Sequence, residues 1–517
     1  MDNKKISSYL LNCVVLFFIF ILLIFSMKYS VIANDDMLDY IINHRIVYHG
    51  RFFTHAIQIF FIKYIPEILS IHVQDFAFIS QAVLKSGLIV FLLNVISLSF
   101  FRFENKRIFL PLINIFSFLL FFAFIFKLKF MFGIETSAFF FGYVFTIPVF
   151  MLLWFMLSDI YVKNEVVSGR KLITFNILVI LNAMSNEEYF FVTLFLLFCF
   201  LLHLKSIHSK FTKNVVILMT ILIIAGIIIF ASNKGFSDII NGYNLSYNFG
   251  FSKKEIFDFL YVYTNKLIYT VLFLWIPLIG GVLAVISAKT DTEQRKKVLL
   301  FLLYSFLGFF LFFAVLYFLG PSFTYENYAE YYLFPRYWIL HPGLLLCYYS
   351  FLIAANLYVA GYLFYIKQNK YCTAIILIFL LLSSGFICKN IKWIEISSKN
   401  KRQTLYILDK LSVFYFRQGK PAILPADNIE LILPLYNNNM PKDLQDKTGQ
   451  AYKNKIYKGY MYLLYIYITY KVNPKYGMSF KSQKEALDAF YKNGGRFKSG
   501  ELKKLNFSYI KNGLKRN

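Results

Sequence analysis

The chain alternates between long apolar runs and short polar segments, a pattern that predicts membrane-spanning helices. A helical span needs roughly 20 apolar residues, with a range of about 17 to 25. Runs of this length occur near residues 9–27, 77–101, 108–126, 136–158, 214–232, 266–288, 298–319, 335–364 and 371–388. The pattern therefore predicts an α-helical polytopic membrane protein.

A further apolar stretch, 172–204, is interrupted by Ser185-Asn186-Glu187-Glu188. Two carboxylates in the middle of a bilayer would be costly. We therefore predict two spans here, 172–185 and 189–204, which brings the number of spans to about 11. Because the first of the two is short, the turn that carries Glu187 and Glu188 is expected to lie below the membrane surface.

The distribution of Lys and Arg over the short loops predicts the orientation of the chain. With Met1 inside, the cytoplasmic loops hold 17 Lys/Arg and 6 Asp/Glu, and the opposite loops hold 11 Lys/Arg and 13 Asp/Glu. The cytoplasmic loops are 1–8, 102–107, 159–171, 203–213, 289–297 and 365–370. An odd number of spans then divides the chain into a transmembrane part, 1–388, and a soluble outer part, 389–517.

Composition narrows the class further. With 58% hydrophobic and only 16% charged residues, the chain is excluded from the water-soluble globular enzymes, and its 62 Phe and 39 Tyr exclude intrinsic disorder. A net charge of +26 would suit a protein that binds nucleic acid. Much of that charge, however, belongs to residues 389–517, which carry 25 Lys/Arg and 9 Asp/Glu. Because that part is predicted to face outward, membrane lipids or an anionic glycan are the expected partners, and nucleic acid is not.

The first outer loop, 28–76, carries an acidic pair. Asn34-Asp35-Asp36 begins a helical pattern that places Asp36 and Asp39 on one face. After Gly50, Arg51 begins a second amphipathic stretch, and helices of this kind lie in the membrane interface. A carboxylate here can deprotonate an acceptor hydroxyl, and an Arg can bind a phosphate bidentately. The acids are equally consistent with a solvated helix cap.

Three further positions can bind substrate. Lys85 is the one cation well within a span, which indicates function unless the side chain snorkels to the surface. Arg336 lies where a span begins on the outer side, a position that suits a lipid phosphate as well as an interfacial anchor beside Tyr337 and Trp338. Glu187 with Glu188 can bind acceptor hydroxyls or simply close a solvated turn.

These features resemble the GT-C superfamily of integral membrane glycosyltransferases, in particular bacterial members that modify surface glycans. The resemblance rests on the inside N-terminus, Asn34-Asp35-Asp36 just past the first span, interfacial helices with His49-Gly50-Arg51, and the outer C-terminal part. It implies an inverting transfer from a polyprenyl-phosphate sugar donor to a cell-surface glycan or lipid acceptor. The active site would lie on the extracytoplasmic face of a cell membrane, most simply the bacterial inner membrane.

Carried over to this chain, the resemblance assigns the general base to Asp36 or Asp35. Asp36 is favoured because it shares a face with Asp39, whereas Asp35 is better placed to cap the helix. Donor phosphate would be bound by Arg51, Arg336 and Lys85, and the acceptor by Glu187, Glu188 and Asp39. Some members bind a divalent metal through a spaced acidic pair; here the acids are adjacent, so metal dependence stays open, and no other cofactor is expected.

Other classes remain as alternatives. A transporter or flippase of lipid-linked glycans would line a central path with charged residues, whereas only Lys85 lies well within a span. A glycan polymerase or ligase would be expected to use Arg and His residues of a large outer loop for its function. A non-catalytic assembly protein would not need the acidic pair at all.

The outer part, 389–517, is expected to be a small mixed α/β domain. A helical pattern covers about 401–417, a strand-like segment covers 422–425, and Ser482 with Glu485 forms a capping box for a helix near 483–492. The tyrosine-rich run 457–472 fits either a strand or a helix lying on the membrane. No nucleophile triad or phosphate-binding loop occurs in this part, so it is expected to bind or shape the site.

Overall fold

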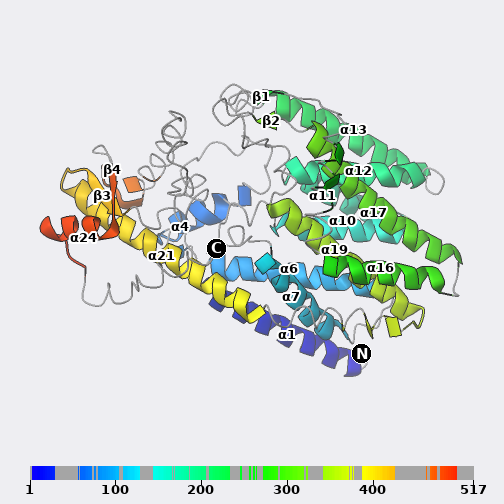
Figure 1. Cartoon of the computed structure of the whole chain (residues 1–517). Coiled ribbons are helices and arrows are strands. Elements are labelled where there is room, and N and C mark those ends of the chain that lie inside the picture. Colours follow the sequence, from blue (N-terminus) through cyan, green and yellow to red (C-terminus); the bar gives the residue numbers. More distant parts are fainter. Residues whose placement is uncertain are drawn as a thin grey trace.

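The computed structural model of the chain is predominantly helical (Figure 1). It describes residues 3–28, 56–103, 109–127, 144–204, 209–232, 272–288, 292–319, 342–371, 387–425 and 462–497, with short gaps inside several ranges, and a few isolated residues elsewhere. Four of the described helices are long and apolar enough to cross a membrane: Tyr9–Met27, Ala82–Arg102, Thr292–Ala314 and Leu345–Tyr365. Shorter apolar helices pack between them, so the chain has the make-up of a helical membrane protein.

Three helices form the amino-terminal group of the bundle. They are α1 (Asn3–Met27), α6 (Lys85–Leu98) and α7 (Leu110–Lys127), and α6 runs on into the 3-10 turn η3 (Ser99–Arg102). The Asn114 side chain donates hydrogen bonds to the side-chain oxygens of Asn12 (2.7 Å) and Asn94 (3.2 Å). In a membrane, burial of apolar surface does not distinguish one helix partner from another, so hydrogen bonds of this kind help to determine which helices pack together.

A second group packs beside the first. It consists of α10 (Thr146–Val162), α11 (Gly169–Ala183), α12 (Glu187–Leu204), α13 (Ser209–Ser232) and α17 (Thr292–Leu319). The Trp154 indole donates a 2.8 Å hydrogen bond to the Ser305 hydroxyl. At Gly308 a Cβ atom would lie 3.3 Å from the Leu196 Cα, so the missing side chain lets α17 and α12 approach closely.

The helix α19 (Pro342–Tyr365) lies at the centre, next to α16 (Leu272–Ser287). The span Leu345–Tyr365 is buried on every side, as expected of a helix that is apolar all round. At Gly361 a Cβ atom would lie 2.0 Å from the Phe100 carbonyl oxygen, so only glycine lets α19 pack against η3. The bundle is therefore closely packed around α19.

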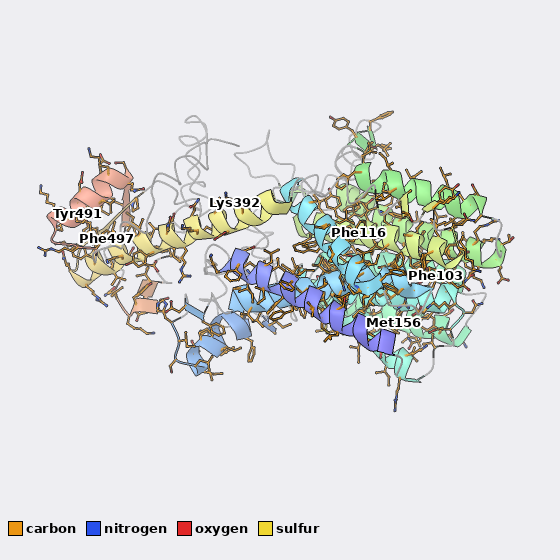
Figure 2. All side chains as sticks on the ribbon, turned by 90° about the horizontal axis from the view of Figure 1, so that it is seen from below. Phe103, Phe116, Met156, Lys392, Tyr491 and Phe497 are labelled. Carbon is orange, nitrogen blue, oxygen red and sulfur yellow. The ribbon has the colours of Figure 1, made fainter. Side chains whose placement is uncertain are left out.

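The carboxyl-terminal part begins with the long helix α21 (Ile387–Arg417), which runs along α1 and out of the bundle (Figures 1 and 2). In Figure 2, Lys392 lies toward the bundle, whereas Tyr491 and Phe497 lie at the far end of α21. There, β3 (Ala422–Pro425) pairs in parallel with β4 (Met478–Lys481), with Ala422 opposite Met478, and α24 (Gln483–Lys492) packs beside them. A second hydrophobic core, which includes Leu411, Leu424, Ile466, Ala486 and Phe490, holds together this part, which we call the outer unit.

A described helix overlaps each predicted span from 9–27 to 335–364, while parts of several spans and most of 371–388 lie outside the described residues. The predicted interruption of 172–204 is present: α11 ends at Ala183, a turn covers Met184 and Ser185, and α12 begins at Glu187. With 15 residues, α11 is about 22 Å long, shorter than a hydrocarbon core of about 30 Å.

In the outer part, the strand at 422–425 and the helix at 483–492 with its capping box are present as predicted. The predicted helix 401–417 is the second half of a longer one, because α21 begins at Ile387 and crosses residue 389 without a break. No Pro or Gly occurs between Ile387 and Gln418, so nothing in the sequence ends the helix there. The described residues of 457–472 include helical pieces at Tyr462 and at 466–467.

Loops that the charge distribution assigns to one side also meet in space. The short strand β1 (Leu245–Ser246) pairs antiparallel with β2 (Ser322–Phe323), and both belong to predicted outer loops. On the other side, Arg102 forms an ion pair with Asp159, and the rings of Phe103 and Tyr365 lie 6.3 Å apart. We call the two ends of the bundle the outer end, where α1 ends and α6 begins, and the inner end.

Candidate functional site

The structure describes only part of the predicted site. Asp35, Asp36, Asp39, Arg51 and Arg336 lie outside the described residues. Glu187 and Glu188 form the first two residues of α12, but their side chains are also outside what the structure describes. Lys85 is therefore the predicted site residue from which the geometry can be built.

Lys85 is the first residue of α6 and is completely buried, with 0% of its surface exposed. Its neighbour Ser86 directs its hydroxyl at the Met27 sulfur, 4.0 Å away, so the first turn of α6 packs against the last turn of α1. A snorkelling Lys would reach the surface of the protein, and Lys85 does not. The structure therefore places its ammonium group inside the outer end of the bundle.

A π-helical turn, η2 (Ser80–Leu84), comes directly before Lys85. Such turns are rare and frequently occur at functional sites, where the extra residue redirects the side chains that follow. A second π-turn, η1 (Phe60–Tyr64), lies in the first outer loop, and the short helix α4 (Ile65–Ile68) follows it. The η1 turn carries Lys63, whose side chain is 11% exposed and whose Nζ lies 4.0 Å from a carboxylate oxygen of Glu67.

Buried charge at the outer end is mostly positive. Among the described residues, the charged side chains in the buried class are Lys63, Lys85, Lys401 and Asp409. Asp409 accepts hydrogen bonds from the hydroxyls of Tyr462 (2.9 Å) and Tyr470 (2.6 Å). Burying a cation is costly unless nearby groups compensate its charge, and the described buried lysines outnumber the described buried carboxylate by three to one.

Lys401 belongs to α21, which is fastened to the end of α1. The Lys28 ammonium lies 3.0 Å from a carboxylate oxygen of Glu395, and the Arg402 guanidinium donates a 3.3 Å hydrogen bond to the Lys28 carbonyl oxygen. The ion pair is a third or more exposed on each side, so it contributes little by itself. The contacts nevertheless place the start of the first outer loop beside the helix that leads to the outer unit.

The inner end carries charges of a different kind. Asp159 pairs with Arg102 and with Lys163, whose Nζ lies 3.0 Å from the carboxylate, and all three side chains are 20–33% exposed. Burial, and then the Arg102 charge, lowers the pKa of the Lys163 ammonium group. A hydrogen bond from Lys171 lowers the pKa of the Glu165 carboxyl group. This network of ion pairs links Arg102 to the segment 159–171 and has the character of a structural contact.

A metal site cannot be assembled from the described residues. No group of three or more His, Cys, Asp or Glu within the described ranges is close enough to hold a metal ion. The acids that could hold one, Asp35, Asp36 and Asp39, lie outside those ranges. Metal dependence therefore stays a prediction from the sequence.

Sequence reasoning missed several features of the outer end. Lys63 lies in the amphipathic stretch after Arg51, and its spacing of four residues from Glu67 predicts a helical pair but not its burial. Lys401 is one of many basic residues of α21, and nothing in the sequence distinguishes it. The π-turn before Lys85 has no sequence signature.

By its fold, the chain belongs to the class of helical membrane-type proteins, with cations buried at one end of an apolar bundle. Comparison with known protein families, with characterised proteins and with solved structures gives no match. The further assignment therefore rests on the sequence and the site geometry alone.

Proposed function

We propose that the chain is a membrane glycosyltransferase of the GT-C type, which transfers a sugar from a polyprenyl-phosphate donor to a surface glycan or lipid acceptor at the outer end of the bundle. The observation that carries this proposal is the burial of Lys85 beside the last turn of α1. A cation inside a membrane bundle indicates function by default, and a phosphate next to an apolar prenyl chain is a ligand that such a position fits.

The acidic pair follows the same end of α1 closely in the sequence. Asp35 comes seven residues after Lys28, and a chain of seven residues spans at most about 25 Å. A carboxylate from this pair can therefore lie within the reach of a donor whose phosphate is bound by Lys85. This supports Asp36, with Asp35 as the alternative, as the general base.

The proposed reaction is an inverting displacement. Asp36 removes the proton from the acceptor hydroxyl, and the resulting oxygen nucleophile attacks the anomeric carbon of the donor sugar from the face opposite the phosphate. The bond between the anomeric carbon and the phosphate oxygen breaks, and the phosphate leaves with the electron pair. Lys85, Arg51 and Arg336 stabilise the departing phosphate, while Glu187, Glu188 and Asp39 position the acceptor.

The arrangement of the loops supports an outward-facing site. Loops assigned to the same side by their Lys and Arg content contact one another, as β1 with β2 and Arg102 with Asp159. The apolar runs predict about 11 spans, and the charge pattern then predicts an inside N-terminus and residues 389–517 on the outside. The outer unit at the end of α21 then lies on the same side as the acidic pair.

The packing of the bundle disfavours the rival class of transporters. A conduit for a charged, lipid-linked glycan would need polar groups along its centre, and there the described chain has α19, which is buried on all sides. Polar side chains of α19 form hydrogen bonds with neighbouring helices. Tyr358, for example, shares a 2.8 Å hydrogen bond with Ser158, and the Asn356 amide donates to the Leu274 carbonyl oxygen at 3.0 Å.

The proposal is tested by comparing surface glycans from cells with and without the gene by mass spectrometry. We expect one glycan or glycolipid to lose a defined sugar mass when the gene is deleted and to regain it when the gene is restored. An unchanged mass profile would argue against a transferase, and accumulation of an intact lipid-linked glycan inside the cell would favour a flippase.

A further inference from the structure

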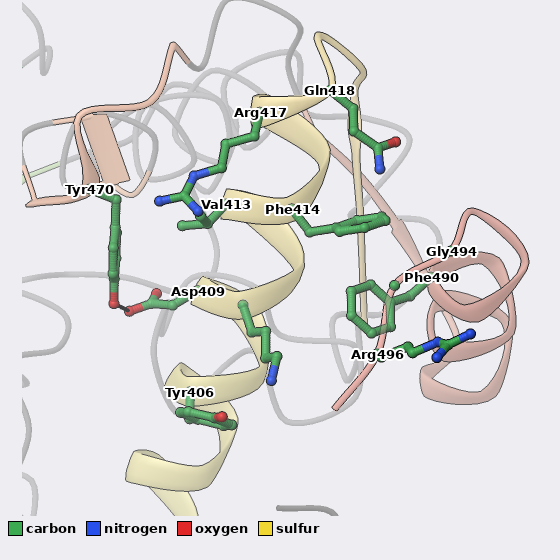
Figure 3. Close-up of a pocket in the computed structure, with 12 residues that line it drawn as sticks. Tyr406, Asp409, Val413, Phe414, Arg417, Gln418, Tyr470, Phe490, Gly494 and Arg496 are labelled. Carbon is green, nitrogen blue, oxygen red and sulfur yellow. Dashed lines mark hydrogen bonds between the residues drawn. The ribbon is translucent and has the colours of Figure 1, made fainter. Parts of the chain in front are cut away.

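The outer unit contains a groove that no step of the proposed reaction uses. It has a volume of about 640 Å³ and runs along the last turns of α21, closed by Tyr470 and by the segment from Phe490 to Arg496 (Figure 3). A cavity of this size is in the range of about 300–1,000 Å³ that holds small ligands. The groove lies in the part of the chain with the largest excess of positive charge.

The groove is lined by cations and aromatic rings together. Arg417 and Arg496 have exposed side chains, and Lys410 is held between rings, with its Nζ 4.7 Å from the centre of the Phe497 ring and 5.7 Å from that of Tyr406. The lining has one carboxylate against three cations, and that carboxylate, Asp409, accepts hydrogen bonds from the hydroxyls of Tyr462 and Tyr470 (Figure 3). The lining therefore offers positive charge to a ligand.

Aromatic side chains supply apolar faces beside these cations. Tyr406 is 39% exposed, and Phe414 is half-buried with its ring 4.8 Å from that of Phe490. In Figure 3, Tyr470 and Arg417 lie toward one side of α21, and Phe490 and Arg496 toward the other. Aromatic rings pack against the apolar faces of sugars, and guanidinium groups bind carboxylates or phosphates. Because both kinds of side chain are spread along one helix, the groove suits an extended acidic saccharide.

The turn after α24 fixes the shape of the groove wall. Gly494 has a φ of +86°, and a Cβ at Gly495 would lie 2.4 Å from a ring carbon of Phe490. Because Phe490 is itself only 1% exposed and packs against Phe414, it has no room to move aside. The glycine pair lets the backbone pass over the ring, and Arg496 follows directly after it.

The position of the groove favours a glycan over a lipid headgroup. Arg402 contacts Lys28 at the end of α1, and Arg417 comes 15 residues later on the same helix, about 22 Å further along its axis. The headgroup region on each side of a bilayer is only about 5–8 Å thick. If α1 ends at the membrane surface, the Arg417 end of the groove lies beyond the lipid headgroups.

We propose that this groove binds an acidic oligosaccharide, a sugar chain that bears carboxylate or phosphate groups. The inference concerns binding alone and does not depend on the transferase activity proposed above. Arg417 and Arg496 bind the acidic groups, and Tyr406 and Phe414 pack against the sugar rings.

The test measures binding to the full-length protein in nanodiscs of phosphatidylcholine. The probes are a hexamer of galacturonic acid, which bears one carboxylate per sugar, and maltohexaose, a neutral chain of equal length. We expect the acidic hexamer to bind and the neutral one to bind at least about tenfold more weakly. The double variant Arg417→Gln/Arg496→Gln should lower the affinity for the acidic hexamer by about tenfold or more for each guanidinium group.

The matched control is Lys481→Gln/Lys484→Gln, which removes the same charge from exposed positions of β4 and α24 outside the groove. Its affinity for the acidic hexamer should stay within about twofold of wild type, since distant exposed charges are screened. Equal losses in the two double variants would overturn the proposal, because they would show charge-dependent binding without a site. Failure of the acidic hexamer to bind would also overturn the proposal. So would binding of phosphatidylglycerol vesicles alone in an Arg417-dependent way, because the groove would then be a lipid site.

Discussion

The Arg402 guanidinium donates a 3.3 Å hydrogen bond to the carbonyl oxygen of Lys28, across 374 residues of sequence. This contact joins the residue that follows α1 to the helix that leads into the outer unit. It places three features at one end of the bundle: the start of the first outer loop, the buried Lys85, and the base of α21. The proposed chemistry depends on this convergence.

Replacing Lys85 by Met removes the buried charge and keeps a side chain of similar length. If Lys85 binds the departing phosphate, product formation should fall by about tenfold to a hundredfold, the effect of losing one charge-assisted hydrogen bond. Lys213→Met, the same change at an exposed position on α13, serves as the control. A Lys85→Met protein with full activity would exclude Lys85 from the site.

Replacing Asp159 by Asn should destabilise the inner end. The change leaves Arg102 and Lys163 beside each other without the carboxylate that both contact. Because these side chains are partly buried, we expect a loss of about 1–3 kcal/mol in the free energy of unfolding. Glu293→Gln removes a carboxylate that is 76% exposed from its pair with Lys297 at the same end, and it should cost less than about 0.5 kcal/mol. Equal effects of the two changes on unfolding by denaturant in detergent would contradict a structural role for Asp159.

Replacing Tyr470 by Phe tests how the outer unit is held together. The Tyr470 hydroxyl donates to Asp409, and its ring lies 5.4 Å from that of His72, which follows the first outer loop's helix α4. Phe keeps the ring but removes a donor to a buried carboxylate, so we expect the outer unit to lose about 1–3 kcal/mol of stability. Resistance to limited proteolysis should fall accordingly. Tyr467→Phe, at a residue that is 51% exposed in the same segment, should leave the cleavage rate unchanged.

Acid should weaken α24 through its capping box. Hydrogen bonds from Ser482 hold the pKa of the Glu485 carboxyl group below its ordinary value of 4.5. A carboxyl group whose pKa is lower in the folded state stabilises it fully above about pH 4.5. That contribution to stability is lost as the pH falls from about 4.5 to below the pKa of the Glu485 carboxyl group in the folded state. The difference in melting temperature between wild type and Glu485→Gln should therefore shrink from pH 6.5 to pH 3.5, and a constant difference would contradict this account.

Local sequence patterns predicted much of the fold. Apolar runs located the helices, two adjacent carboxylates at 187–188 located the turn between α11 and α12, and Ser482 with Glu485 located the start of α24. Each of these features depends on residues that are close together in the sequence, so it can be predicted from the sequence alone. The continuity of α21 across residue 389 was missed because the change in composition there suggested a boundary, although no residue ends the helix.

The site could be predicted only in part, because it depends on contacts between distant segments. The position of Lys85 within a span indicated function, but its complete burial follows from the packing of η2 and α6 against α1. The groove needs Arg417, Tyr470 and Arg496 together, and these residues are dozens of positions apart. The periodicity of the sequence does not predict that these three residues lie close together in space.

The central claim, glycosyl transfer with a first-loop Asp as the base, is tested most directly by the double variant Asp35→Asn/Asp36→Asn. Transfer is measured by mass spectrometry of the surface glycan after the variant gene replaces the deleted one. Asn keeps the size of the side chain and cannot accept the proton, so we expect the product to fall to about 1% of wild type or less at normal protein levels. Asp75→Asn, an exposed position near the end of the same loop, should give wild-type product. Full product from the double variant would contradict the account.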